Sequence, residues 1–183
     1  MKATGIVRRI DELGRIVIPK EIRKTLRIRE GDPLEIYTDR EGQVILKKYS
    51  PIGQLSEFAQ EYCEALYENT SYTAMISDRD NIIAIAGGSK KEYIEKRISP
   101  ELEKIIEQRN NYSNIGNDIT IKITYEDESP DKYTAQVIMP IVMQGDPIGS
   151  VVLVSGEDGA NMGEIEIKLV ETAAGFLSKQ MED

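Results

Sequence analysis

Basic residues are concentrated near the start of this 183-residue chain, where guanidinium and ammonium groups could bind a polyanion. Between residues 2 and 29 the basic side chains outnumber the acidic ones by nine to three. The nine are Lys2, Arg8, Arg9, Arg15, Lys20, Arg23, Lys24, Arg27 and Arg29. Clustered cations of this kind bind phosphate backbones because they displace condensed counterions. The pattern therefore predicts a polyanionic partner.

The charge changes sign along the chain. Residues 1–50 carry 12 Lys and Arg against 8 Asp and Glu, whereas residues 51–183 carry 11 against 24. Opposite signs predict two domains, residues 1–50 and residues 51–183. The acidic second domain should keep DNA away from every surface except the basic one.

The inventory of reactive groups is small. The sequence has no histidine and a single cysteine, so the usual imidazole bases and zinc ligands are missing. It also lacks a serine nucleophile motif, and we expect neither enzymatic activity nor a cofactor or metal. No apolar run approaches the roughly 20 residues needed to span a bilayer, and the first five residues lack the apolar core of a signal peptide. We expect a soluble cytoplasmic protein with no membrane partner.

Short elements must position the basic residues. The expected order is ββαββ, with strands at Ile6 to Ile10 and Ile16 to Ile18, a helix at Lys20 to Leu26, and strands at Leu34 to Thr38 and Gln43 to Lys48. Pro suits the start of the helix, and glycines suit the turns between strands. About fifty residues bury too little apolar surface to be stable alone without a disulfide or metal. We therefore expect an obligate homodimer in which two chains complete each other's hairpins.

Two sequence blocks carry a family resemblance. They are GIVRRIDELGRIVIPKEIRKTLRI at residues 5–28 and GDPLEIYTDREGQVILKKY at residues 31–49. Together they resemble the AbrB family of bacterial transition-state regulators. The resemblance implies a swapped-hairpin dimer that binds double-stranded DNA.

The family's DNA-contacting basic positions correspond here to Arg8, Arg15, Arg23 and Lys24. Arginine is common in the family at the last of these, and a lysine cannot make a bidentate guanidinium contact. Few Asn or Gln side chains accompany the arginines, so recognition of DNA shape is favoured over a strict base code. The alternative is a solvated basic face, which remains the better interpretation for Arg9 and Arg27.

The second domain begins and ends with amphipathic helices. The periodicity predicts helices at Ile52 to Asn69, Ser99 to Arg109 and Gly163 to Met181, and strands at Tyr72 to Ser77, Asn81 to Ala86, Ile119 to Tyr125, Ala135 to Val142 and Ile148 to Ser155. The expected fold class of the whole chain is α+β. The terminal helices could be lids on the sheet, but their continuous apolar stripes favour a helical bundle between subunits.

The closing hairpin carries a second resemblance. Its sequence, IMPIVMQGDPIGSVVLVS at residues 138–155, resembles GAF domains, an antiparallel sheet flanked by helices. An AbrB-like start joined to a GAF-like end resembles a family of sporulation regulators. This implies a transcriptional regulator of forespore genes, both activator and repressor, in which two DNA-binding dimers form a homotetramer at the forespore nucleoid.

GAF domains often bind small molecules, and an unidentified ligand is one hypothesis for this domain. The bordering residues would be Ser77, Ala86, Gly87, Gly88, Ser89 and the 110–118 loop. The Gly-Gly-Ser-Lys segment at residues 87–90 could offer amides to an anion, but it lacks P-loop spacing and is better explained as a turn. The opposite hypothesis is a ligand-free oligomerisation module.

Three remaining features have simpler explanations or rivals. Cys63 lies on an apolar helix stripe, which favours a buried small hydrophobe over a redox sensor. The acidic run Glu126 to Glu128 could hold a divalent cation but is more typical of an exposed loop. A swapped-hairpin domain also occurs in antitoxins, an alternative function as a DNA- and protein-binding module, although their tails tend to be short and disordered.

Overall fold

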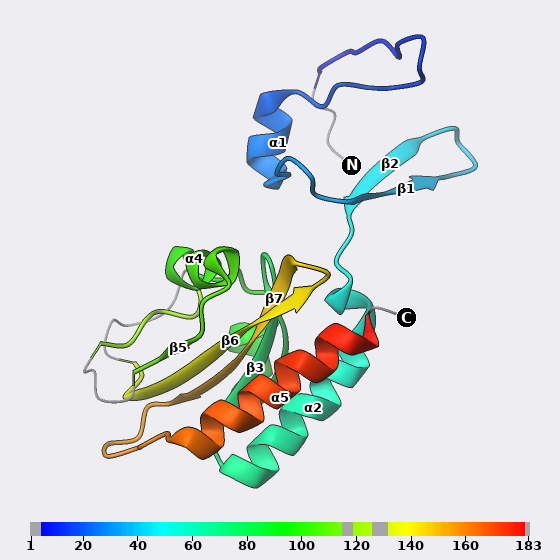
Figure 1. Cartoon of the computed structure of the whole chain (residues 1–183). Helices are drawn as coiled ribbons and strands as arrows, with labels where there is room; N and C mark the ends of the chain where they lie inside the picture. Colours follow the sequence, from blue (N-terminus) through cyan, green and yellow to red (C-terminus); the bar gives the residue numbers. More distant parts are fainter. Residues whose placement is uncertain (1–4, 115–118, 126–131, 182–183) are drawn as a thin grey trace. The chain divides into compact units, whose positions relative to one another are not determined.

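The chain folds into two compact units. The computed structural model describes residues 5–114, 119–125 and 132–181 (Figure 1). The units are Met1–Tyr49, called the N-terminal unit below, and Ser50–Asp183, called the C-terminal unit. Helices and antiparallel sheets coexist in the chain, so the fold class is α+β, as the sequence predicted. No helix in the described ranges is both long and apolar enough to cross a bilayer.

The N-terminal unit contains one short helix and one hairpin. Helix α1 spans Lys20–Leu26, and the antiparallel strands β1 and β2 span Leu34–Thr38 and Val44–Lys48. Pro19 precedes the helix, where its fixed φ fits and no amide donor is lost. Arg27 ends the helix in the left-handed conformation with φ 52°. All three elements were predicted within one residue.

The two strands expected at Ile6 to Ile10 and Ile16 to Ile18 are absent, and that prediction is wrong for the single chain. Within residues 5–19 the backbone makes a turn at Asp11 to Arg15, but no ladder extends from it. A lone two-stranded hairpin is marginal in water, and stability requires further strands or a packed face. The observed element order of this unit is therefore αββ.

The N-terminal unit exposes its apolar side chains. The exposed fractions reach 90% for Val7, 72% for Val17, 67% for Ile36 and 65% for Val44. Helix α1 has no buried residue. Both clusters of buried apolar residues belong to the C-terminal unit. The described residues of the N-terminal unit therefore form no hydrophobic core of their own.

The C-terminal unit is built on a five-stranded antiparallel sheet of order β4-β3-β7-β6-β5. The strands span Thr73–Asp78 (β3), Ile82–Ala86 (β4), Tyr112–Ser113 (β5), Ala135–Met143 (β6) and Asp146–Ser155 (β7). Short connections join β3 to β4 and β6 to β7 as antiparallel hairpins. The two-residue strand β5 was not predicted.

Helices cover both faces of this sheet. They span Ile52–Leu55 (η1, a 3-10 turn), Ser56–Thr70 (α2), Lys90–Tyr93 (α3), Pro100–Gln108 (α4) and Glu164–Gln180 (α5). Helices α2 and α5 lie side by side on one face, and α4 packs against β6 and β7 on the other (Figure 1). The predicted terminal helices are thus present, although the first begins as a 3-10 turn. Helix α3 was missed.

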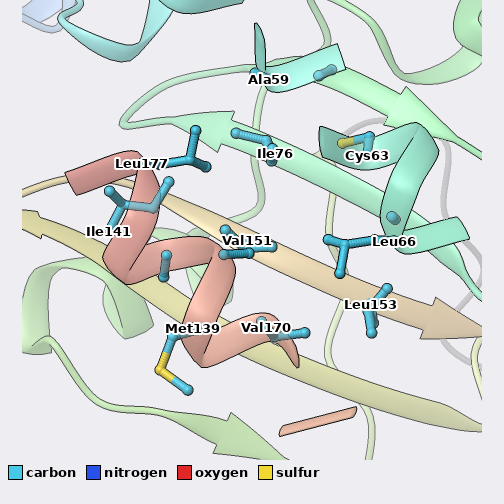
Figure 2. Packing of buried hydrophobic residues seen from close by; sticks show 14 of the residues in the cluster. Ala59, Cys63, Leu66, Ile76, Met139, Ile141, Val151, Leu153, Val170 and Leu177 are labelled. Atoms are coloured by element: carbon cyan, nitrogen blue, oxygen red, sulfur yellow. The ribbon is translucent and has the colours of Figure 1, made fainter. Parts of the chain in front are cut away.

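Strand alternation divides the buried residues into two cores. On β7, Val151 and Leu153 point to α2 and α5, whereas Val152 and Val154 point to the α4 side. Figure 2 shows the first core, in which Cys63 and Leu66 of α2 and Val170 of α5 pack on one face of the sheet. Each fully buried aliphatic side chain contributes roughly 1.5–3 kcal/mol, so the C-terminal unit can be stable without a partner.

The strand predicted at Ile119 to Tyr125 is also absent. A side chain replaces the missing strand partner: Gln136 Nε2 donates to the Ile121 carbonyl at 2.6 Å, and the Ile121 N–H donates to Gln136 Oε1 at 2.7 Å. The segment also joins the fold through an isolated bridge between Thr124 and Ile98 and through the buried side chain of Ile123. Because Gln136 is fully buried, these bonds satisfy groups that water cannot reach.

A second glutamine binds the outer strand in the same way. Gln60 of α2 donates through Nε2 to the Ile85 carbonyl at 3.0 Å and accepts the Ile85 N–H through Oε1 at 3.3 Å. Ile85 lies in β4, the edge strand of the sheet. The backbone groups of this residue are therefore not available to another strand.

Candidate nucleic-acid interface

A tight turn at Asp11 to Arg15 presents the first basic side chains. The Asp11 N–H donates to the Arg15 carbonyl, and the Gly14 N–H donates to the Asp11 carbonyl, both at 3.0 Å. Gly14 has φ 75°, which a residue without a Cβ adopts at little cost. The Asp11 carboxylate closes the turn, since Oδ1 accepts the N–H groups of Leu13 and Arg15 at 3.0 and 2.8 Å.

The same carboxylate holds the Arg15 side chain. Arg15 Nε donates to Asp11 Oδ2 at 2.8 Å, while the arginine side chain stays 70% exposed. The Arg15 backbone N–H and then its side chain keep the pKa of Asp11 below its ordinary value, so this carboxyl is ionised at neutral pH. Asp11 was not among the predicted site residues, although the Asp-x-x-Gly spacing is typical of such turns.

Arg23 and Lys24 lie in the last turn of α1. Both side chains are exposed. Their carbonyls accept the N–H groups that follow the helix, from Ile28 to Arg23 at 2.8 Å and from Arg27 to Lys24 at 3.4 Å. Cations at a helix C-terminus are favoured because unpaired carbonyls concentrate negative potential there.

Arg8 lies in the extended segment before the turn and is exposed. All four predicted DNA-contacting residues are therefore accessible to solvent, on three parts of the N-terminal unit: the segment before the turn, the turn and α1. Only Arg23 and Lys24 share an element. Arg9 is equally exposed, whereas Arg27 is half-buried and its carbonyl accepts a bond from Lys48 Nζ at 3.0 Å.

The glycine segment considered for anion binding is a packed turn. Gly87 has φ 77°, which favours glycine, and a Cβ there would collide with the Tyr67 ring. The Thr73 hydroxyl donates to the Gly87 carbonyl at 2.9 Å. A Cβ on Gly88 would meet the Ile85 Cδ1 methyl at 2.9 Å, which is the flexible end of a side chain. The fold therefore accounts for Gly87 without a ligand.

Other candidate ligand residues are used inside the fold. Ser77 is fully buried and shares a 2.7 Å hydrogen bond with Ser150 on β7. Residues 115–118 of the loop considered for ligand binding lie outside the described residues, as does the acidic run Glu126 to Glu128. A small-molecule site in this unit stays a prediction. In the described ranges no group of acidic or cysteine side chains is arranged to hold a metal ion.

The single cysteine is a core residue. Cys63 is fully buried in the cluster between the sheet and helices α2 and α5 (Figure 2). Burial raises the pKa of its thiol well above the ordinary value, so almost no thiolate forms near neutral pH. The prediction of a buried small hydrophobe is confirmed.

The outer surface of α2 and α5 carries an aromatic cluster. The rings of Phe58 and Phe176 stack with centroids 5.7 Å apart, and the Tyr62 ring lies 5.6 Å from that of Phe176. Phe58 and Phe176 remain 39% and 36% exposed. The terminal helices are therefore lids on the sheet that also leave apolar rings open to solvent.

Comparison with known proteins identifies both parts of the chain. Residues 7–54 match the family model described as antidote-toxin recognition MazE, bacterial antitoxin. The transition state regulatory protein AbrB of Bacillus subtilis is 67% identical over 51 residues, which cover 28% of this chain and 52% of that protein. The N-terminal unit is thus AbrB-like in sequence, as the two sequence blocks indicated.

The second part decides the family. Residues 54–182 match the family model described as stage V sporulation protein T C-terminal, transcription factor. Stage V sporulation protein T of Bacillus subtilis is 56% identical over 182 residues, covering 100% of this chain and 99% of that protein. The chain belongs to the stage V sporulation protein T family.

Solved structures show the fold of the C-terminal unit. The GAF domain of an Acinetobacter phosphoenolpyruvate-protein phosphotransferase aligns with a TM-score of 0.57 at 10% identity, covering 69% of this chain and 81% of that structure. At this identity the likeness concerns the fold alone. It confirms the GAF-like fold predicted for the second domain of this member of the stage V sporulation protein T family.

Proposed function

We propose that this chain is a DNA-binding transcriptional regulator of forespore genes during sporulation, acting as both activator and repressor in the cytoplasm of the forespore, at the nucleoid. The observation that carries the proposal is the 56% identity to stage V sporulation protein T over the whole chain. The family description as a transcription factor supports regulation rather than catalysis.

The N-terminal unit is the proposed DNA-binding part, through Arg8, Arg15, Arg23 and Lys24. Exposure of all four supports this role, because phosphate contacts require accessible cations. In a twofold dimer each cation occurs twice, which gives a basic surface wide enough to follow neighbouring phosphates. The acidic C-terminal unit would repel the duplex from its own surface.

Dimerisation through swapped hairpins is proposed for the same unit. The exposed side chains of Val7, Val17, Ile36 and Val44 support it, since they have no cover in a single chain. Pairing with a second chain would also supply strand partners for the segments on either side of the Asp11 turn. Dimers would then join as a homotetramer through α2 and α5, where the exposed rings of Phe58 and Phe176 favour contact with another copy.

A salt series on labelled duplex DNA tests the DNA-binding proposal. Arg8→Ala, Arg15→Ala and Arg23→Ala should each weaken binding while size-exclusion chromatography shows an intact oligomer. The slope of log affinity against log salt should fall by about 0.9 for each phosphate that is no longer neutralised, hence by about 1.8 for a dimer. Arg40→Ala, an exposed arginine at the β1–β2 turn outside the proposed set, is the matched control. Equal effects from Arg40→Ala and the other variants would reject the assigned positions.

The antitoxin alternative rests on the MazE match over residues 7–54. That match covers only the N-terminal unit and the first turn of the next, whereas the rest of the chain is a folded GAF-like domain. Antitoxin function would require a toxin-binding tail, and residues 54–182 match a transcription-factor family instead. The regulator is therefore the function that the observations favour.

A further inference from the structure

We propose that Asp11 is a positioning residue for DNA recognition, holding the Arg15 guanidinium in the orientation that contacts the duplex. The inference rests on the proposed function, because it takes Arg15 as a DNA contact. An acidic side chain among phosphate-binding arginines should by itself weaken binding through repulsion. Its presence in this turn therefore calls for a compensating role.

The two carboxylate oxygens of Asp11 bind different groups, one the backbone of the turn and the other the Arg15 side chain. Oδ1 shapes the backbone, because it accepts the N–H groups of Leu13 and Arg15. Oδ2 shapes the side chain, because it accepts Arg15 Nε at 2.8 Å. Both oxygens belong to one planar group, so the turn and the guanidinium are fixed in a single geometry.

The bond uses the part of the guanidinium that DNA does not need. The donor that contacts Asp11 is Nε, and the two terminal nitrogens lie at the other end of the planar fork. Those terminal nitrogens can make a bidentate contact to phosphate or to a guanine edge. A pre-oriented arginine loses less side-chain entropy on binding than a mobile one. Asp11 would thus offset its own repulsion of phosphate.

Asp11→Asn removes the bond to the Arg15 side chain and keeps the bonds to the backbone. The amide oxygen can still accept the two backbone N–H groups, so the turn should persist, while the amide nitrogen cannot accept from Arg15 Nε. The variant also removes a negative charge near the phosphates, which alone would strengthen DNA binding. The two effects have opposite signs, so the direction of the change identifies the role.

A double-mutant cycle on the full-length protein tests the proposal with a labelled duplex at fixed salt. Asp11→Asn should weaken binding by up to about fivefold when Arg15 is present, a limit set by exposed ion pairs. In the Arg15→Ala background the same change should leave affinity unchanged or raise it. An equal gain in both backgrounds would overturn the proposal, because Asp11 would then act only by repulsion.

Arg15→Lys supplies a second test that leaves the turn untouched. Lysine has no Nε donor in a fixed fork, so Asp11→Asn should lose most of its effect in that background. An undiminished effect there would show that Asp11 acts through the backbone, and the inference would fail. Circular dichroism and size-exclusion chromatography confirm folding and assembly of each variant. If Arg15→Ala leaves DNA affinity unchanged, the DNA-contact assignment of Arg15 fails first, a result distinct from failure of the Asp11 role.

Discussion

The two units of this chain differ in how their apolar side chains are placed, which are mostly buried in the C-terminal unit and mostly exposed in the N-terminal unit. The C-terminal unit buries its branched side chains on both faces of a five-stranded sheet, with Val151 and Val152 fully buried on opposite sides. The N-terminal unit leaves Val7, Val17 and Ile36 mostly exposed. The difference teaches that the C-terminal unit has a core of its own, and it supports the proposal that a second chain completes the N-terminal unit.

The largest effect is expected from a charge in the exposed face of the N-terminal hairpin. Ile36 and Val44 lie on the same side of the β1–β2 ladder, at positions that a partner chain would cover. Ile36→Asp should abolish dimerisation of this unit, because burying an unpaired carboxylate costs several kcal/mol. Loss of DNA binding should accompany it.

Analytical ultracentrifugation measures the loss of assembly, and a DNA-binding titration measures its consequence. The thermal unfolding of the C-terminal unit should be unchanged in Ile36→Asp. Gln43→Asp, at a half-buried position beside the same hairpin turn, is the control for added charge. An intact dimer in Ile36→Asp would mean that this face is not the dimer interface. The exposed apolar side chains of the N-terminal hairpin would then not be explained by a partner chain.

A cavity in the C-terminal core should have the next largest effect. Leu153→Ala removes a fully buried side chain between the sheet and α5, and should lower the free energy of unfolding by about 2–5 kcal/mol. Because this core belongs to one chain, the loss should not depend on protein concentration. Opening of this unit can be measured at each denaturant concentration by the rate at which Cys63 reacts with a thiol reagent. The reaction reports on this unit alone, since the N-terminal unit has no cysteine. A concentration-dependent loss would contradict an independent core.

The smallest effect is expected from the glutamine that replaces a strand partner. Gln136→Leu leaves the Ile121 N–H and carbonyl without their bonds and should destabilise the C-terminal unit by about 1–3 kcal/mol. Hydrogen exchange at Ile121 should accelerate more than at Val152 in the central strand. Gln60→Leu, which removes similar bonds at a half-buried position, should cost less because water can replace them. Equal losses would mean that burial of Gln136 is not what makes its bonds matter.

Sequence periodicity predicted several elements to within one residue of their observed bounds. Helix α1 and strand β1 have the predicted bounds, and α5 differs by one residue at each end. The segment at Ile119 to Tyr125 alternates apolar and polar residues as a strand would, yet the backbone of Ile121 bonds the Gln136 side chain. The local sequence pattern cannot distinguish a segment that bonds another strand's backbone from one that bonds a side-chain amide.

The sequence likewise predicted only part of the candidate site. The resemblance to the AbrB family indicated Arg8, Arg15, Arg23 and Lys24, and the structure adds their exposure but not their function. Asp11 escaped notice because an acidic residue in a basic stretch looks like a mere charge balance. Only the folded turn reveals that its two oxygens bond separate parts of Arg15. We propose that the strands expected on either side of this turn are absent because their strand partners belong to a second chain.

Gln60 has a consequence for how this sheet can meet a strand of another chain. By occupying both backbone groups of Ile85 on the outermost strand, it blocks edge-to-edge sheet extension at that residue, a route by which β proteins form fibres. A single amide thus protects one position of an otherwise open edge.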